Sequence, residues 1–346
     1  MIERFNLTKD YSISRVINGC WQLSAGHSLK TTLDEEDIMK AFIMLVEKGF
    51  TTFDCADIYT DAEEFLGRFS KRLKKTTSVT NEIQIHTKYV PDKDKLATLT
   101  FEDTKSIITR SLARLNRETL DLVQFHWWEY ETNGMLETID HLQKLKEEGY
   151  LRHIALTNFD TKHIDMIVKK GIDIVSCQTQ YSLLDRRPEK GFINYCRDHN
   201  IAQLCYGTLA GGLISEKHIG DYDIDPDNRS QIKYLQVIKE GMGIDNFQKL
   251  LIILNNIAIK HNVEIAQVAV RYILDQSGVG AVIIGTRNSR HVQANEKIFS
   301  FKLDQEDIKT IKSFLANVKI LAGDCFELER DDPMFKSIIK TNLNAN

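Results

Sequence analysis

Four polar side chains stand where apolar, β-rich runs of the sequence end: Asp54, Tyr59, Lys88 and His126. A phenol with a pKa of about 10 is a poor acid at neutral pH unless its anion is stabilised. The ammonium group of Lys88 can supply that stabilisation, and the carboxylate of Asp54 can hold the ammonium charged and oriented. His126 can donate or accept a hydrogen bond at a substrate oxygen. Tyr59 would then serve as a general acid.

This set of residue types includes no serine or cysteine nucleophile and no metal-binding cluster. It suits delivery of a proton to a carbonyl oxygen while a hydride from a bound nicotinamide attacks the carbon. Each residue alone has a simpler interpretation, since His126 could be a core histidine, Asp54 a helix cap and Lys88 a solvated loop residue. Their combination at successive strand ends favours the catalytic interpretation.

The elements that must position these residues follow a regular order. Short β-rich runs alternate with longer helix-period stretches, such as Glu35–Lys48 and Thr104–Leu115, which is typical of parallel strands joined by helices. The predicted strands are Val16–Asn18, Thr51–Asp54, Ile83–Lys88, Leu120–His126, Ile154–Thr157, Ile174–Gln178, Ala202–Tyr206 and Ala281–Ile284. Eight parallel strands predict an α/β fold of the (β/α)8 TIM barrel type, in which the carboxyl ends of the strands form the catalytic face.

Further features complete the predicted organisation. Gly49, Gly149 and Gly171 follow charged helix ends, where glycine can adopt a left-handed conformation. The irregular stretch from Ile214 to Asp245 is a candidate active-site loop or cover. We expect a single domain over residues 1–346, with the barrel at about 16–300 and a C-terminal helix and tail at 301–346. Within that region, residues 304–316 resemble an added helix, followed by an irregular tail.

The bulk composition is that of a soluble globular protein. A net charge of −4, with 42% apolar and 27% charged residues, does not suggest nucleic acid or an anionic membrane as a partner. No signal-peptide core or membrane-length apolar run is present, so we expect a cytoplasmic protein. The six cysteines lack disulfide or zinc spacing and are expected to be reduced and buried. Composition leaves the oligomeric state open.

Several segments together resemble the aldo-keto reductase family, in order, from about Gly19 to Glu296. The segment FDCADIYTDAEEFLG resembles the family signature with its Asp and Tyr, IHTKYV carries the family's Lys, and LDLVQFHW carries its His. ALTNF resembles the Ser-Asn-Phe segment, and QTQY resembles the Gln-x-x-Tyr segment. CYGTLAGGLISEK resembles the stretch whose tyrosine stacks on nicotinamide, and IIGTRNSRHVQANE resembles the adenosine-side segment.

The resemblance implies NAD(P)H-dependent reduction of an aldehyde or ketone, with Asp54, Tyr59, Lys88 and His126 as the catalytic residues. It implies cofactor contacts from Gly19, Cys20, Trp21, Asn158, Gln178, Tyr206, Gly207, Leu209, Gly285, Thr286, Arg287, His291 and Asn295. Trp21 is also expected beside the substrate. Of the adjacent Trp127 and Trp128, one should line the pocket, and Trp127 is the predicted one.

Departures from the family pattern bear on the cofactor. Thr157 replaces the usual Ser, Gly207-Thr208 replaces Ser-Pro, and Ala294-Asn295 replaces the Glu-Asn pair near adenine. Arg287, helped by Arg290, could hold a 2′-phosphate by a bidentate contact, which favours NADPH over NADH. His291 stands where the family often has Arg or Gln.

Two alternatives remain open at this point. The family includes potassium-channel β-subunits that bind NADPH and turn over slowly, so a cofactor-binding regulatory protein is one of them. The other is an NAD-dependent sugar dehydrogenase, which the same four residues permit by microscopic reversibility. The substrate itself is not specified by these motifs.

Overall fold

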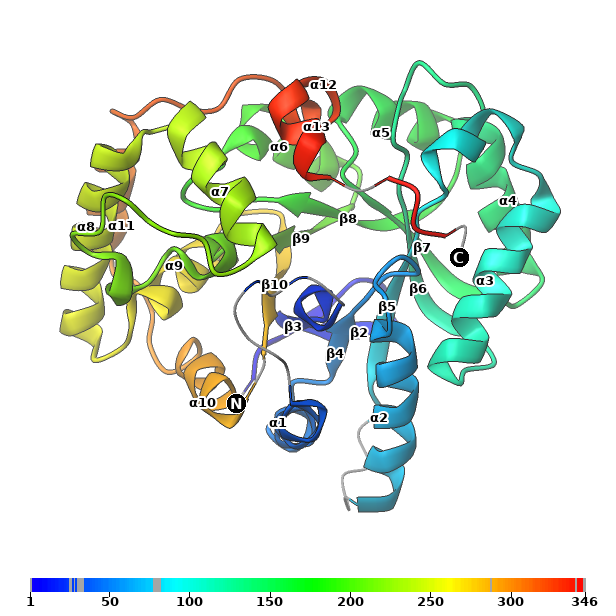
Figure 1. The fold of residues 1–346 in the computed structure, drawn as a ribbon, viewed down its shortest axis with the longest axis horizontal. Helices are drawn as coiled ribbons and strands as arrows, with labels where there is room; N and C mark the ends of the chain where they lie inside the picture. The colour runs from blue at the N-terminus through cyan, green and yellow to red at the C-terminus, as the bar shows by residue number, and fades with distance from the viewer. Residues whose placement is uncertain are drawn as a thin grey trace.

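The computed structural model describes residues 2–24, 27, 29, 34–76, 82–286, 288–339 and 341–344. Eight parallel strands form a closed barrel in which the last strand pairs with the first (Figure 1). The strands are β3 (Val16–Gly19), β4 (Thr52–Asp54), β5 (Gln84–Tyr89), β6 (Leu120–Phe125), β7 (Leu151–Thr157), β8 (Ile174–Gln180), β9 (Ala202–Tyr206) and β10 (Val279–Gly285). The TIM barrel predicted from the alternation of strands and helices is confirmed.

Helices surround the barrel and cover its outer face (Figure 1). Those between β3 and β9 are α1 (Glu35–Glu47), α2 (Ala62–Thr76), α3 (Phe101–Leu115), α4 (Met135–Glu147), α5 (Thr161–Lys169) and α6 (Phe192–Asp198). Their starts follow ordinary capping chemistry. Thr100 and Asp103 form a reciprocal capping box at α3, and Asp34 accepts backbone hydrogen bonds at the start of α1. The glycines predicted to end helices, Gly49, Gly149 and Gly171, all have positive φ.

The segment between β9 and β10 is largely helical. It holds α7 (Arg229–Glu240), α8 (Ile244–His261) and α9 (Ile265–Leu274). The prediction of an irregular stretch from Ile214 to Asp245 is therefore wrong for its second half. Asn228 caps α7 by accepting from the backbone of Gln231, and the buried side chains of Tyr234, Val237 and Ile238 anchor the helix in the hydrophobic core. The glycines and aspartates that suggested a loop precede this helix.

The region after β10 is also more ordered than the sequence suggested. It contains α10 (Ser289–Lys297), α11 (Gln305–Leu315), α12 (Glu327–Asp331) and α13 (Pro333–Ile338). The added helix expected at residues 304–316 is confirmed as α11. The tail beyond it was expected to be irregular, but α12 and α13 lie within it. α13 packs against α7.

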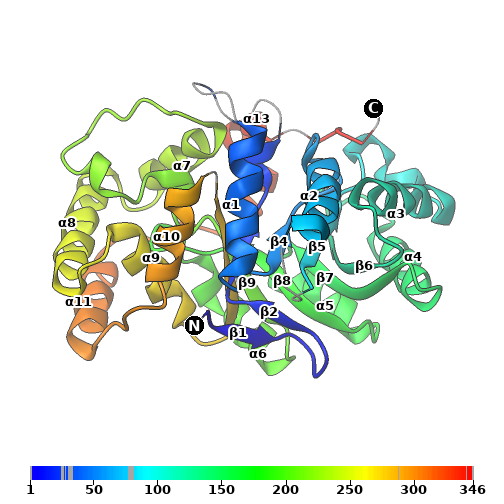
Figure 2. The same ribbon diagram turned by 90° about the horizontal axis from the view of Figure 1, so that it is seen from below.

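The two ends of the barrel differ in character. A hairpin of β1 (Arg4–Asn6) and β2 (Ser12–Ser14), absent from the sequence prediction, lies at the end opposite α13 (Figure 2). From this hairpin, Tyr11 and Ile13 join an apolar cluster with barrel residues including Ile17, Leu122 and Leu204. Polar side chains occupy the other end, at the carboxyl ends of the strands. No helix among the described residues is long and apolar enough to cross a membrane.

Candidate active site

The barrel brings the four predicted catalytic residues to one cavity of about 960 Å³. Asp54 ends β4, Lys88 lies near the end of β5, and His126 directly follows β6. Tyr59 lies in the turn between β4 and α2, close to Trp21, with their ring centroids 4.8 Å apart. The cavity is at the upper end of the size range of small-molecule sites.

Lys88 and Asp54 form a buried ion pair at the base of this cavity. Lys88 Nζ lies 2.7 Å from Asp54 Oδ2 and also donates to the carbonyl oxygen of Cys55 at 2.8 Å. Burial alone would lower the pKa of Lys88, but the negative charge of Asp54 outweighs burial and raises that pKa. Lys88 is therefore a permanently charged ammonium group.

Tyr59 lies beside this ammonium, with Lys88 Nζ 4.9 Å from the centre of its ring. Burial raises the pKa of Tyr59 to about 12, and the opposing effect of Lys88 is smaller because Asp54 neutralises part of its charge. The sequence suggested that Lys88 would make Tyr59 a stronger acid, but the effect of burial on the pKa of Tyr59 is larger than that of Lys88. Tyr59 consequently keeps its proton throughout the neutral pH range.

His126 is neutral and has a defined tautomer. Its Nδ1 lies 3.2 Å from the carbonyl oxygen of Thr157, so Nδ1 carries the proton and Nε2 is left as an acceptor. Nε2 has no hydrogen-bond partner among the described residues. Burial first, and the charge of Arg330 second, lower the pKa of His126 to about 3. The rings of Trp128 and Phe326 contact the imidazole edge to face.

Most of the predicted cofactor residues line the cavity. These are Gly19, Trp21, Asn158, Gln178, Tyr206, Gly207, Leu209, Gly285, His291 and Asn295. Cys20 and Thr286 do not reach it. Cys20 is fully buried in the outer core, since neighbours at a strand end point to opposite sides, and Thr286 donates to Asn18 beneath the cavity wall. Arg287 lies outside the described residues.

The predicted choice between the two tryptophans is corrected by the structure. Trp128 lines the cavity, whereas Trp127 is fully buried against Phe125 in the outer core. Alternation along β6 explains this result, because His126 and Trp128 are two residues apart and share a face. Trp128 is therefore the one of the two tryptophans that lines the cavity.

The stretch from Ile214 to Asp245 was expected to form a loop or cover at the site, but the sequence did not identify which residues of α7 and of the tail line the cavity. Lys233 of α7, Phe326 before α12 and Leu343 of the tail line the cavity. The tail reaches the loop after β4, where Asn344 Nδ2 donates to Asp57 Oδ2 at 2.9 Å. These contacts join segments far apart in the sequence, so local sequence patterns do not predict them. Gln124 was also missed, although its position two residues before His126 places it on the inward face of β6.

The residues of the cavity fit a nicotinamide dinucleotide. Tyr206 supplies an aromatic ring, and its hydroxyl group donates to Asn158 Oδ1 at 2.8 Å, which leaves Asn158 Nδ2 as a donor. Besides Lys88, the cationic side chains among the described residues that line the same cavity are Lys217, Arg229, Lys233, Arg290 and Lys297. The first residues of α7 and α10 also line it, and helix N-termini favour phosphate groups. Aromatic, amide and cationic groups thus match nicotinamide, carboxamide and phosphates.

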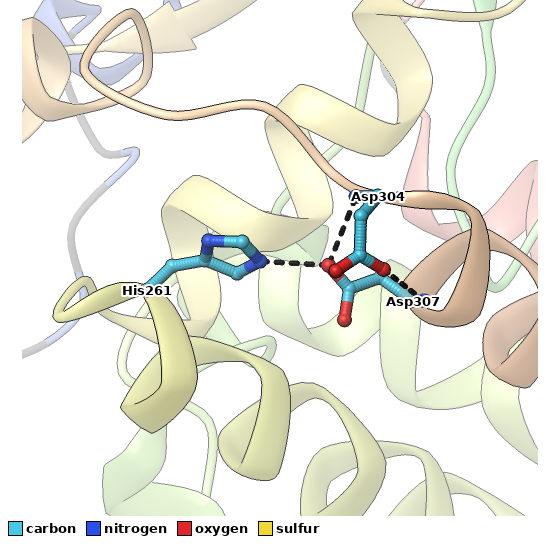
Figure 3. Close-up of side chains that lie close together, drawn as sticks. All are labelled: His261, Asp304 and Asp307. Carbon is cyan, nitrogen blue, oxygen red and sulfur yellow. Dashed lines mark hydrogen bonds and ion pairs between the residues drawn. The ribbon is translucent and has the colours of Figure 1, made fainter.

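A second cluster of titratable groups lies between α8 and α11 (Figure 3). His261 Nε2 is 2.7 Å from Asp307 Oδ2, and Asp304 lies beside them. The ammonium group of Lys260 contacts both carboxylates, at 2.5 and 2.8 Å. A cation of the protein already compensates this charge, so the cluster joins the two helices and does not resemble an open metal site.

Comparisons with known proteins agree with this geometry. The family model described as "Aldo/keto reductase family" matches residues 15–316. Aldo-keto reductase YhdN of Bacillus subtilis is 26% identical over 313 residues, covering 88% of this chain and 90% of the relative. The NADH-specific methylglyoxal reductase of Escherichia coli is 24% identical over 321 residues, with coverages of 87% and 94%. The structure of a glycerol dehydrogenase from Gluconobacter oxydans superposes with a TM-score of 0.74 at 24% identity, covering 91% and 94%.

Proposed function

The chain belongs to the aldo/keto reductase family of NAD(P)H-dependent oxidoreductases, and we propose that it reduces an aldehyde or ketone to an alcohol with Tyr59 as general acid. The observation that carries this proposal is the Lys88–Asp54 ion pair at 2.7 Å beside a protonated Tyr59 in one cavity. When bound, the nicotinamide supplies the hydride.

The roles of the four residues follow from their contacts. Tyr59 donates its proton to the substrate oxygen, and the nearby ammonium of Lys88 stabilises the phenolate that forms. Asp54 keeps Lys88 charged and fixed. His126, with its proton on Nδ1, offers Nε2 as an acceptor to the new hydroxyl group and shapes the pocket with Trp128 and Phe326.

The substrate side of the cavity is mostly apolar. Its walls include Trp21, Ile58, Val90, Trp128, Phe326 and Leu343. Aromatic and aliphatic walls around one polar corner favour a carbonyl compound with an apolar or planar body. We propose small aromatic and branched aliphatic aldehydes as the first substrates to test.

The test is the loss of reduced-nicotinamide absorbance with purified protein, NADPH or NADH, and a panel of aromatic and aliphatic aldehydes. Aldehyde-dependent oxidation of the cofactor is the expected result. Tight cofactor binding without turnover across the panel, and in the reverse reaction with alcohols and sugars, would contradict the proposal. That outcome would favour a cofactor-binding regulatory role.

We further propose NADPH as the preferred cofactor, on the basis of Arg287 and the nearby Arg290. An NADH-specific relative from Escherichia coli and an NADP(+) aldo-keto reductase from Schizosaccharomyces pombe show that both preferences occur among similar proteins. Arg287→Ala is expected to weaken NADPH binding by roughly 10-fold or more, as for loss of a charge-assisted bond, and to leave NADH nearly unaffected. Fluorescence titration with the two cofactors measures this. Equal weakening of both would mean that Arg287 does not contact the 2′-phosphate.

A further inference from the structure

Gln124 is a buried amide that the catalytic scheme does not yet use. It lies on the inward face of β6, fully buried, between the catalytic Asp54 and the cofactor-side Gln178. Its Nε2 donates to Asp54 Oδ1 at 2.7 Å, and its Oε1 accepts from Gln178 Nε2 at 2.8 Å. Gln178 Nε2 also donates to Asp54 Oδ1 at 2.7 Å. These three side chains form a closed triangle of hydrogen bonds.

Only one assignment of donors and acceptors satisfies all three hydrogen bonds. An ionised carboxylate accepts and cannot donate, so Gln124 must turn its NH2 group toward Asp54 and its carbonyl oxygen toward Gln178. Gln178 must then turn its NH2 group inward, where both hydrogens are used by Asp54 and Gln124. Because Gln178 lines the cavity, its Oε1 is the atom that remains to face a ligand.

The result is a pair of amides with opposite polarity at the cavity wall. Gln178 presents an acceptor, whereas the neighbouring Asn158 presents its Nδ2 as a donor, because Tyr206 occupies Asn158 Oδ1. The two residues adjoin each other, since the backbone nitrogen of Asn158 donates to the carbonyl oxygen of Gln178 at 2.9 Å. A primary carboxamide has an NH2 group that can donate to Gln178 and a carbonyl oxygen that can accept from Asn158, so the two side chains are complementary to it.

We infer that Gln124 is a positioning residue that fixes the amide of Gln178 with its carbonyl toward the cofactor's carboxamide and ties that contact to Asp54. This inference rests on the proposed function, because it requires a nicotinamide in the cavity. The same triangle holds Asp54 Oδ1, which leaves Oδ2 for Lys88. Gln124 therefore connects the cofactor site to the group that assists proton delivery.

The first test compares two cofactors that differ only at the carboxamide: oxidised NADP and its 3-acetylpyridine analogue, which has a methyl ketone and no NH2 donor. Wild-type protein is expected to bind the carboxamide form about 3- to 10-fold more tightly, as one net hydrogen bond would give. In Gln124→Leu the Gln178 amide is free to rotate, so this preference should fall to within about 2-fold. Binding is measured by quenching of protein fluorescence and does not require turnover.

A second variant separates the two roles of Gln124. In Gln124→Glu an ionised carboxylate still accepts from Gln178, so the preference for the carboxamide should persist. It no longer donates to Asp54, and two carboxylates then adjoin, so the pH profile of kcat should gain an inflection that wild type lacks. If Gln124 had a purely structural role, Gln124→Glu should reduce the cofactor preference more than Gln124→Leu does, since a buried charge disturbs packing more than leucine does.

Gln203→Leu is the matched control. Gln203 is also a fully buried glutamine in a barrel strand, but it neither lines the cavity nor forms a hydrogen bond with Asp54 or Gln178. This variant should keep the wild-type cofactor preference and kcat. If wild type does not distinguish the two cofactors, or if Gln124→Leu keeps the full preference, the inference is wrong. If wild type binds neither cofactor, the proposed function fails instead.

Discussion

Tyr59→Phe is expected to lower kcat for aldehyde reduction by roughly 10²- to 10⁴-fold, the usual contribution of a general acid, with little change in cofactor affinity. The substitution removes only the hydroxyl group, so the contact between the ring and Trp21 remains. Steady-state kinetics with NADPH and the best aldehyde of the panel, together with fluorescence titration of the cofactor, measure both quantities.

Tyr11→Phe is a suitable control for this substitution. Tyr11 Oη bonds to His86 at 3.1 Å within the apolar end of the barrel, and Tyr11 does not line the cavity. Its loss should alter stability slightly and leave kcat unchanged. A Tyr59→Phe protein that retains more than about a tenth of wild-type kcat would remove Tyr59 as the acid, because such a small loss is below the range for this role.

The fold could be predicted because its signals are local. Each strand is a short β-rich run, and a stretch with the hydrophobic periodicity of a helix follows it. Three of the connections carry a glycine in the left-handed conformation: Gly49, Gly149 and Gly171. The four proposed catalytic residues could be placed together for a related reason. Parallel barrel strands all end on one face, so polar strand ends such as Lys88 and His126 must meet there.

Other residues of the cavity were not predicted, either because their positions depend on contacts between distant segments or because the alternation of side chains was not considered. Successive side chains after His126 point to opposite sides, which places Trp128 on the same side as His126. The prediction that Trp127 lines the pocket could therefore have been avoided. Gln124 carries the same signal. By contrast, the packing of α7 and α12 against the cavity depends on Lys233, Glu329 and other distant partners, and no spacing within either segment reveals them.

The ionic cluster formed by Glu329 of α12, Arg187 and Lys233 of α7 should stabilise the packing of α12 and α7 beside the cavity. Glu329 is fully buried, and its carboxylate lies 3.0 Å from both Arg187 Nη1 and Lys233 Nζ. Arg187 is equally buried and also pairs with Asp185 at 2.7 Å. Breaking such a pair by removing one partner leaves uncompensated buried charge, so Glu329→Gln should lower the free energy of unfolding by about 3–5 kcal/mol at neutral pH.

Chemical denaturation at neutral pH, with Glu36→Gln as control, measures this effect. Glu36 pairs with Arg72 on the protein surface, where solvent screens the charges, so its loss should change little. A Glu329→Gln protein as stable as wild type would mean that the amide replaces the carboxylate fully and that the cluster contributes through packing alone.

The pH dependence gives an independent check of the charge of Glu329. Burial alone would raise its pKa, but Lys233 and Arg187 outweigh burial and lower that pKa to about 2. A group with a depressed pKa stabilises the fold above its unfolded value, and this contribution is lost as the pH falls through the folded value. Wild type should therefore approach the variant's stability between about pH 4.5 and pH 2, by about 3 kcal/mol. A stability difference that stays constant over this window would contradict an ionised Glu329.

The same substitution should also affect the reaction, because α12 links the cluster to the cavity. Arg330, next to Glu329, donates to the carbonyl oxygens of Trp127 and Asn158 at 2.9 and 2.7 Å, and Phe326 contacts His126. Loosening α12 releases these contacts without removing any of the four proposed catalytic residues. We therefore expect Glu329→Gln to raise KM for aldehyde more than it lowers kcat, the opposite of Tyr59→Phe. A fall in kcat alone would place Glu329 in the chemical step.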